Sequence, residues 1–392
     1  MHQTAAAIQA AIDGTAASGG GAVTLPPGEI SLDRGLRLRS GVTLRGSGPT
    51  TVLRKAPARE YPLAGYANYG MRDVALRSTA GLEPGMTVWI TDSRHGGFHE
   101  TLATITWVED GRVGLDAGLE SDYSADASPM LRTMHPLVYA LDAAAVTLGD
   151  LRLEGNADGD PRDLGACRGG AVYFGTCREV LVERVTQSDF NGDGLSFQFC
   201  RDVMVRDSRF DGNRGNGLHP GAGSTGIRFE RIASVGNRAC GIFVCVRATR
   251  MSVSGSVISG NGLGVSIGAY DCHNLFDDCD ISGNRGSGIE TRPDPSPCEV
   301  HHLAIRRCRL VDNSGAQIRL AGITHDVEIS DCELAAASAA TAALVSESGV
   351  RNLTLRGNRI HGTAQIGIPA RLPGGRFCRR GRLLLQLAAP LP

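Results

Sequence analysis

A unit of about 24 residues repeats through the middle of the chain and constrains its fold more than any other feature. Copies that begin at Asn213, Asn237, Asn261 and Asn284 follow one another at steps of 24, 24 and 23 residues. Each copy has a glycine-containing or asparagine-containing turn, a short strand with alternating apolar residues, a charged bend and a second strand. Such a unit buries its apolar face only when copies stack on one another. The repeat therefore predicts an all-β fold, a right-handed single-stranded parallel β-helix.

The alternation within the first strand of each copy predicts which residues face outward. Apolar pairs such as Ile242 with Val244 and Val265 with Ile267 point to the core, and the residues between them point away from it. The predicted outward column is Tyr173, Ser196, His219, Phe243, Ser266, Glu290 and Arg319, and a second column one pleat along is Gln198, Gly221, Cys245, Gly268 and Arg292. Because neighbouring coils lie about 4.8 Å apart, the columns predict a long outer groove.

Another column, three residues beyond each second strand, is predicted to lie inside the coils. Its members are Val185, Ser208, Ile232, Ser256, Cys279, Cys308, Cys332 and Asn358. This column assigns several of the 11 cysteines to small buried positions. The cysteines are spaced singly, which favours free thiols over a zinc ribbon or a disulfide framework.

The repeat divides the chain into four predicted segments. Residues 1–69 hold a short amphipathic capping helix over residues 4–16 and the first coils. Residues 70–135 lose the repeat and are interpreted as an inserted β segment that flanks the groove. Residues 136–368 carry the coils of the β-helix. Residues 369–392 no longer follow the coil and form a tail or a cap.

The overall charge excludes some classes of partner. A net charge of −1 gives no global field to attract nucleic acid or an anionic membrane, so neither partner is expected. No apolar run approaches the roughly 18 residues of a membrane span. The first residues lack the basic start and apolar stretch of a signal peptide. We expect a cytoplasmic protein, or a secreted one whose signal has been removed.

Residues from about 25 to 365 resemble the pectin lyase-like superfamily. The opening AIQAAIDGTAASGGGAVTLPPGEISL and the following SGVTLRGSG look like the entry segment of polygalacturonases, mannuronan C5-epimerases and related lyases. NGLHPGAGSTGIRFERIASVGN is similar to the epimerases, but their catalytic Asp-Pro-His is His219-Pro220-Gly221 here. NGDG is similar to a polygalacturonase motif and implicates Asp193, although Gly215-Asn216 replace that family's next aspartates. The resemblance implies a carbohydrate-active β-helix and leaves its reaction open.

Four residues are candidates for catalysis. His219 projects from the middle of the outward column, in a turn that contains proline and glycine. An imidazole there can exchange a proton near neutral pH. The alternative for His219 is a surface histidine that makes one hydrogen bond. Tyr173 would be the catalytic partner of His219, with one of the two acting as the base and the other as the acid. Asp193 is either a general acid or an ordinary Asp-Gly turn residue, and Glu290 is either a catalytic carboxylate or a group that binds ring hydroxyls.

Other outward residues are candidates for substrate binding. Arg292 and Arg319 can neutralise the carboxylate of a uronate. An alternative for Arg292 is a salt bridge with Glu290 on the same strand. The remaining candidates in the two columns and the neighbouring turn are Gln198, Ser196, Asn216, Phe243 and Ser266.

An acidic loop is the one candidate metal site. Asp158 and Asp160 alternate with other oxygen-bearing residues, as in the start of a calcium loop, but its sixth position is Pro161 and no glutamate closes it. An EF-hand is thereby excluded. A looser Ca²⁺ site, a pair of hydrolase acids and a solvated loop remain as alternatives. No cofactor is required by the predicted chemistry.

Three functions remain open at this stage. The first is an enzyme that abstracts a proton beside a uronate carboxylate, giving β-elimination or C5 epimerisation. The second is a glycoside hydrolase or transglycosylase that uses carboxylates of the groove. The third is a non-catalytic carbohydrate-binding or structural β-helix. The expected partner is a polysaccharide or oligosaccharide, and the expected assembly is a monomer or a homotrimer.

Overall fold

The computed structural model describes residues 4–94, 98–133, 136–160, 162–164, 167–338, 340–366 and 384–387. The chain forms two compact units. Unit 1 comprises Met1–Gln198 with Asn213–Gly215, and unit 2 comprises Phe199–Gly212 with Asn216–Pro392. Parallel strands of successive coils pair in both units, which confirms the predicted all-β solenoid. No helix among the described residues is long and apolar enough to cross a membrane.

Unit 1 begins with a helix that packs on the first coils, as the sequence predicts. In α1 (Ala5–Ala17), Ile8 and Ile12 are buried, and Thr4 caps the N-terminus by accepting a hydrogen bond from the Ala7 N–H at 3.2 Å. The helix contacts strands of the first coils. These coils contain β1 (Gly21–Thr24), β2 (Gly28–Leu32), β3 (Leu36–Arg37), β4 (Val42–Arg45), β5 (Thr51–Lys55), β12 (Val138–Leu141), β13 (Ala144–Glu154), β14 (Gly170–Gly175), β15 (Arg178–Ser188) and β16 (Asp193–Gln198).

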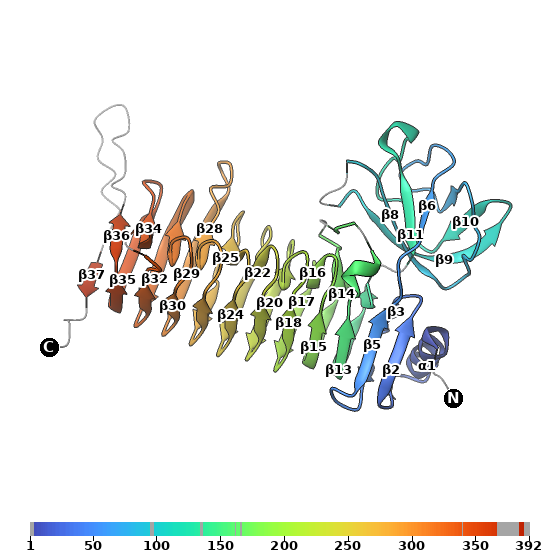
Figure 1. Cartoon of the computed structure of the whole chain (residues 1–392), viewed down its shortest axis with the longest axis horizontal. Coiled ribbons are helices and arrows are strands. Elements are labelled where there is room, and N and C mark those ends of the chain that lie inside the picture. Colours follow the sequence, from blue (N-terminus) through green and yellow to red (C-terminus); the bar gives the residue numbers. More distant parts are fainter. Residues whose placement is uncertain are drawn as a thin grey trace. The chain divides into compact units, whose positions relative to one another are not determined.

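A six-stranded antiparallel sheet is inserted between β5 and β12 of unit 1 (Figure 1). Its strands are β6 (Glu60–Pro62), β7 (Asp73–Ala75), β8 (Thr87–Thr91), β9 (Thr101–Glu109), β10 (Arg112–Leu115) and β11 (Met130–Thr133). The sheet thus begins before residue 70, the start predicted from the sequence. It has its own apolar core, which includes Val88, Ile90 and Leu131. A bridge between Leu63 and Leu76 joins the ends of its two edge strands.

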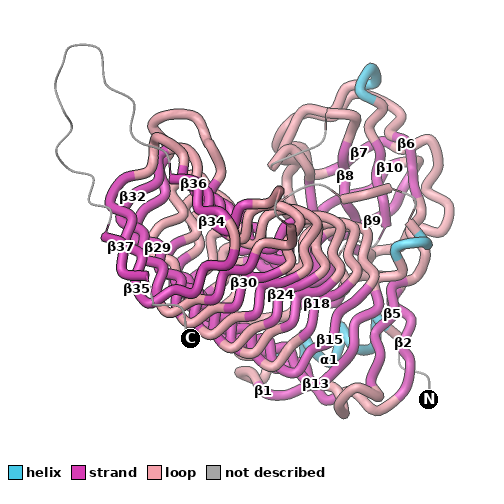
Figure 2. Tube along the Cα trace, turned by 60° about the vertical axis from the view of Figure 1, so that its left-hand side comes forward, coloured by secondary structure: helices cyan, strands magenta, loops and turns pink. Residues whose placement is uncertain are grey.

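Unit 2 consists of stacked coils, in which strands of one coil lie beside the equivalent strands of the next (Figure 2). One sheet contains β19 (Leu218–Pro220), β22 (Cys240–Phe243), β25 (Leu263–Ile267), β28 (Ile289–Thr291), β31 (Ile318–Leu320), β34 (Ala342–Ser346) and β36 (Thr363–Ile366). The other contains β17 (Arg201–Arg206), β18 (Arg209–Asp211), β20 (Thr225–Glu230), β21 (Ala233–Val235), β23 (Thr249–Ser254), β24 (Val257–Ser259), β26 (Leu275–Asp277), β27 (Asp280–Ser282), β29 (Glu299–Arg306), β30 (Arg309–Val311), β32 (Ile323–Ser330), β33 (Glu333–Ala335), β35 (Arg351–His361) and β37 (Leu384–Leu387). Within the predicted tail or cap at residues 369–392, the structure describes only β37, and the other residues of this segment lie outside the described ones.

Buried asparagines connect the turns of unit 2. Asn237, Asn261, Asn284 and Asn313 have no exposed surface. The side-chain amide of Asn237 donates to Asn261 Oδ1 at 2.9 Å, that of Asn261 to Asn284 Oδ1 at 3.1 Å, and that of Asn284 to Asn313 Oδ1 at 2.8 Å. Each Oδ1 also accepts the backbone N–H of the preceding asparagine. The asparagines that mark the repeat in the sequence therefore form a hydrogen-bonded ladder along the coils.

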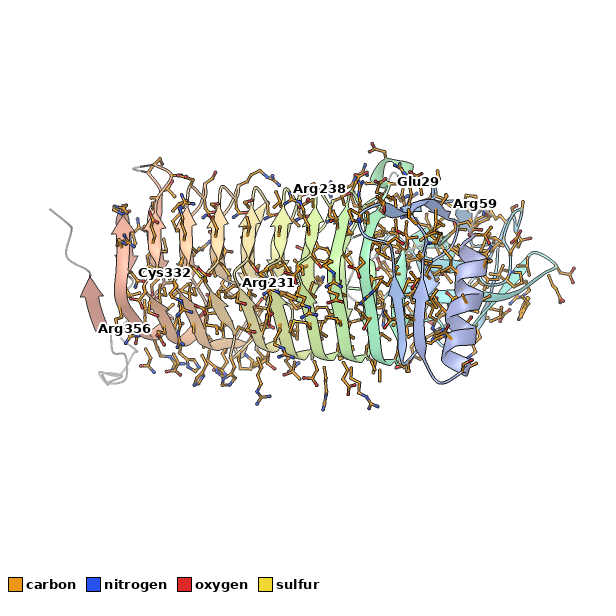
Figure 3. All side chains as sticks on the ribbon, turned by 90° about the horizontal axis from the view of Figure 1, so that it is seen from below. Glu29, Arg59, Arg231, Arg238, Cys332 and Arg356 are labelled. Atoms are coloured by element: carbon orange, nitrogen blue, oxygen red, sulfur yellow. The ribbon has the colours of Figure 1, made fainter. Side chains whose placement is uncertain are left out.

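The predicted interior column is also present. In Figure 3 the side chains of unit 2 recur in rows from coil to coil, with Cys332 labelled among them. Cys279, Cys308 and Cys332 are buried, and the Cys308 N–H donates to Cys332 Sγ at 3.4 Å. Asn358 ends the column by accepting the Cys332 N–H at 2.9 Å. The ten cysteines within the described residues are free thiols.

The asparagine ladder generates the first testable prediction. Replacing Asn284 with alanine removes the acceptor of the buried Asn261 N–H and the donor to Asn313 Oδ1. A buried polar group left without a partner costs about 1–3 kcal/mol. We expect Asn284→Ala to lower the free energy of unfolding in urea by about 3 kcal/mol. Asn68→Ala, at an exposed position of unit 1, is the control and should change it by less than about 0.5 kcal/mol. Equal losses in the two variants would contradict a structural role for the ladder.

Candidate functional site

The parallel register of unit 2 brings the predicted outward residues into one column. Phe243 on β22 lies beside Ser266 on β25, Ser266 lies beside Glu290 on β28, and Glu290 lies beside Arg319 on β31. Leu218 pairs with Ile242, which places His219 of β19 in the coil before Phe243. The predicted column is thus confirmed across these five coils. It is the frame on which the candidate site is built.

Phe243 contacts both an imidazole and a guanidinium. The rings of His219 and Phe243 meet edge to face, with centroids 5.1 Å apart and an interplanar angle of 89°. The guanidinium carbon of Arg292 lies over the Phe243 ring, 4.6 Å from its centroid. A cation in this position is attracted by the electron-rich ring face. The Phe243 ring therefore contacts both an imidazole and a positive charge.

Arg292 reaches Phe243 because its side chain runs back along the coils. Its Nη1 donates to Ser266 Oγ at 3.0 Å. Gly268 provides the space, since a Cβ atom at that position would lie 2.1 Å from Arg292 Nη2. The long side chain of Arg292 thus reaches the same aromatic ring that His219 contacts from another coil.

Carboxylates surround the arginines of the column. Arg292 Nη2 lies 3.6 Å from Asp271 Oδ2, and Arg292 Nε lies 3.6 Å from Asp294 Oδ2. Arg319 pairs with the carboxylates of the neighbouring strand and loop, at 3.8 Å from Glu290 Oε2 and 2.8 Å from Glu347 Oε1. Arg292 pairs with Asp271 and Asp294 rather than with Glu290, so the predicted Arg292–Glu290 salt bridge is wrong.

Asp271 fixes the backbone turn beneath Arg292. Its side chain is buried and accepts the Gly268 N–H at 2.8 Å and the Ala248 N–H at 2.9 Å. Burial raises the pKa of Asp271 to about 7. Asp271 lies in a turn outside both outward columns, so the strand pattern does not single it out. Its position between the Gly268 turn and Arg292 makes it a positioning residue.

His219 and Asn216 are less accessible than the sequence suggests. His219 is 5% exposed, so only a small part of its ring reaches the surface. The Asn216 Oδ1 atom accepts the Cys240 N–H at 3.0 Å. Asn216 therefore supports the start of β22, and its role in substrate binding stays a prediction.

The outward residues of unit 1 are covered, and the prediction that they line an open groove is wrong. Tyr173 is 3% exposed and packs with Tyr139 and with Leu102 of the inserted strand β9. Ser196 and Gln198 have no exposed surface, because Ser196 Oγ and Gln198 Nε2 both donate to the Cys167 carbonyl, at 2.6 and 2.9 Å. Asp193 is 4% exposed. The period of the strand predicts which way a side chain points but not which segments lie over it.

The two predicted metal ligands face cations of the protein. The Asp158 carboxylate is exposed and pairs with Arg214 at 3.0 Å. Asp160 is buried, with Lys55 Nζ at 3.7 Å and Arg132 Nη1 at 3.8 Å. Positive charges beside a carboxylate oppose the binding of a further cation there. The Ca²⁺ site at Asp158 and Asp160 stays a prediction that this geometry disfavours.

A cavity of about 340 Å³ in unit 1 contains a buried carboxyl that the sequence does not reveal. Glu100 is 2% exposed, and Thr91 Oγ1 lies 3.4 Å from its Oε1. Within the described residues, Glu100 Oε2 has no hydrogen-bond partner. Burial raises the pKa of Glu100 to about 8, so the group is mostly protonated at neutral pH. Its burial comes from tertiary packing, which no local pattern around Glu100 predicts.

The comparisons with known proteins agree with this architecture. A family model described as the right handed beta helix region matches residues 264–371. The A-module of the Azotobacter vinelandii mannuronan C-5 epimerase AlgE4 is similar to this chain at 20% identity and a TM-score of 0.62. The similarity covers 92% of this chain and 85% of the AlgE4 module. The A-module of AlgE6 from the same organism is similar at 18% identity and a TM-score of 0.58, and this similarity covers 99% of this chain and 95% of the AlgE6 module.

The chain is a right-handed parallel β-helix protein. ORF18 of Geobacillus virus E2 is also similar, over 89% of this chain and 56% of its own, at 12% identity and a TM-score of 0.52. No curated protein matches the sequence. At these identities the similarity establishes the fold, which is the right-handed parallel β-helix predicted from the sequence.

Glu100 provides a prediction for the pH dependence of this β-helix. The folded-state pKa of Glu100, about 8, lies above its ordinary value of 4.5. The folded state therefore binds more protons between these values, and raising the pH through this window lowers the stability of the native protein. Glu100→Gln has no such proton to lose. We expect it to be more stable than the native protein by up to about 4 kcal/mol at about pH 9, with the gain fading toward about pH 4.

Urea unfolding at a series of pH values measures this difference. Glu109→Gln, at the exposed end of strand β9, which directly follows Glu100, is the matched control and should show no such pH-dependent gain. A difference between Glu100→Gln and the native protein that does not change with pH would show that Glu100 is ionised normally in the folded state.

Proposed function

We propose that this protein acts on a uronate-containing polysaccharide by removing the proton at C5 of a uronate, giving β-elimination or C5 epimerisation. The observation that carries the proposal is that Phe243 contacts both His219 and Arg292. Proton abstraction beside a carboxylate needs a base and a positive charge that neutralises that carboxylate. The column offers an imidazole and a guanidinium that both contact the Phe243 ring.

The groups of the column have complementary roles in this reaction. Arg292 binds the uronate carboxylate and stabilises the negative charge that spreads onto it when the C5 proton leaves. Phe243 supports one sugar ring, and His219 exchanges the proton. Elimination follows when the C4–O4 bond breaks and a C4–C5 double bond forms. Epimerisation follows when a proton returns to C5 from the other face.

The residues beyond Arg292 extend the binding surface. Glu290 lies on the same coil as Arg292, Arg319 lies on the next coil, and coils of a β-helix lie about 4.8 Å apart. A polysaccharide that runs along the column can therefore contact them with neighbouring sugars, Arg319 through a carboxylate and Glu290 through ring hydroxyls. The similarity to the AlgE4 and AlgE6 A-modules, whose names describe mannuronan epimerases, is consistent with a substrate of this class.

The proposal is tested first with a panel of uronate and neutral polysaccharides. Elimination produces ultraviolet absorbance from an unsaturated uronate, and epimerisation changes the uronate stereochemistry in the NMR spectrum without cleavage. Either result with a uronate polymer supports the proposal. New reducing ends without absorbance would instead indicate a glycoside hydrolase, and binding without any reaction would indicate a carbohydrate-binding β-helix. Both outcomes would contradict the proposal.

The position of the Arg292 charge gives a sharper prediction. Gly268→Ala places a Cβ atom where Arg292 Nη2 now lies, so the guanidinium must leave the Phe243 face while the arginine itself remains. Loss of a positioned charge that stabilises a transition state costs about 10²–10³-fold in kcat. We expect a loss of this size in Gly268→Ala and in Arg292→Ala. Arg307→Ala, at an exposed arginine of unit 2 paired with Asp277, should keep full activity. Full activity in Gly268→Ala would contradict the assigned role of Arg292.

His219→Gln tests the proton-transfer role. Glutamine retains a polar side chain of similar reach but cannot take up a proton near neutral pH. General acid–base groups contribute about 10²–10⁴-fold, so we expect kcat to fall by that factor while polysaccharide binding persists. Binding is measured separately by retardation of the protein in gels that contain the polysaccharide. An unchanged kcat would show that another residue carries the proton.

A further inference from the structure

Four histidines of unit 2 gather at one corner of three consecutive coils. His273 precedes β26, His301 and His302 lie in β29, and His325 lies in β32. The register pairs His301 with His325, and the His273 N–H donates to the His301 carbonyl at 3.0 Å. The repeat of the coil therefore places histidines from distant parts of the sequence beside one another. None of them belongs to the column proposed to act on polysaccharide.

The backbone at this corner turns consecutive histidines toward each other. His273 and His302 have φ values of 61° and 54°, in the left-handed region that histidine adopts more readily than most residues. In a regular strand, neighbouring residues such as His301 and His302 would point to opposite faces. Here the left-handed residue breaks the alternation, and the two Nδ1 atoms lie 2.7 Å apart.

The ring nitrogens are close enough to share one metal ion. One nitrogen from each of His273, His301 and His302 lies within 4.8 Å of the other two. Zinc–nitrogen bonds of about 2.0–2.1 Å place two ligands of one tetrahedral ion about 3.3 Å apart. His273 and His302 are exposed, so small rotations of their side chains can close the remaining distance. Three ligands on one side leave a fourth position open to water.

The electrostatic surroundings favour the form of histidine that binds metals. Desolvation and the neighbouring His302 lower the pKa of His273, with Arg250 acting in the same direction. Desolvation, His302 and His325 lower the pKa of His301, and Glu299 opposes them. Both shifts favour the neutral imidazole, which is the form that binds a metal.

We propose that His273, His301 and His302 form a binding site for a first-row transition-metal dication such as Zn²⁺. Imidazole ligands suit zinc, copper and nickel better than they suit calcium or magnesium. His325 stacks on His301 with centroids 5.2 Å apart, and its ring nitrogens lie 3.1 Å from Glu299 Oε2 and 2.8 Å from Asp326 Oδ2. The two carboxylates orient His325, which stacks on His301, and add the negative charge that a bound dication needs nearby. The ion would join two adjacent coils.

Zinc binding to the full chain tests the site. The protein is freed of metal with a chelator, and Zn²⁺ is added in a calorimetric titration. We expect one more bound equivalent in the native protein than in the double variant His273→Ala/His302→Ala. His361→Ala, an exposed histidine at the end of β35, is the matched control and should keep that equivalent. Asp326→Asn should bind about tenfold more weakly, because it removes only the group that orients His325.

A second readout separates this site from the free cysteines. Co²⁺ bound by histidine nitrogens shows visible bands without the thiolate charge-transfer absorbance in the near ultraviolet. A spectrum of this kind that disappears in the double variant supports the site. Three results would overturn it: no zinc bound by the native protein, the same zinc content in the double variant, or a cobalt spectrum dominated by thiolate. Thermal unfolding of both variants without metal shows that each remains folded.

Discussion

Hydrogen bonding between adjacent coils is the interaction on which the rest of unit 2 depends. Each strand satisfies its backbone groups through the strand of the next coil, and the buried Asn237–Asn313 ladder does the same for the turns. An asparagine in this ladder has its partners only when the neighbouring coil is in register. A shift of one residue would break the ladder and also turn the apolar residues outward. Register is thus specified twice, by the core and by the turns.

The fixed register determines which side chains lie together at the surface. Residues about 24 positions apart become neighbours, so a function can be assembled by placing suitable residues at one coil position. On one sheet this brings together Phe243, Ser266, Glu290 and Arg319, and it allows Arg292 to lie back over Phe243 through the space at Gly268. At another corner it stacks the four histidines. The two sites use the same stacking but have no residue in common.

Much of this arrangement could be predicted from the sequence. The asparagine spacing and the strand alternation predicted the coils, the interior cysteines and the column from Phe243 to Arg319. The contact of Arg292 with Phe243 could not be predicted, because it depends on the rotamer of a long side chain and on the space beside Gly268. A signal for the histidine site did exist, since His301 and His325 are one repeat apart. It becomes visible only when the alignment is extended to the corners of the coil.

The residues of unit 1 show what the sequence pattern could not predict, which is burial by another segment. Period-2 alternation predicted an outward direction for Tyr173, Ser196 and Gln198, but the inserted strand β9 and the Cys167 carbonyl cover them. Burial by a distant segment leaves no trace in the local pattern, and the same is true of Glu100. The most direct measurement of the proposed chemistry follows the C5 proton itself. With a polyuronate deuterated at C5, the protein should release the label into water, and Gly268→Ala should release it about 10²–10³-fold more slowly. Retention of the label while the polymer is cleaved would contradict proton abstraction at C5.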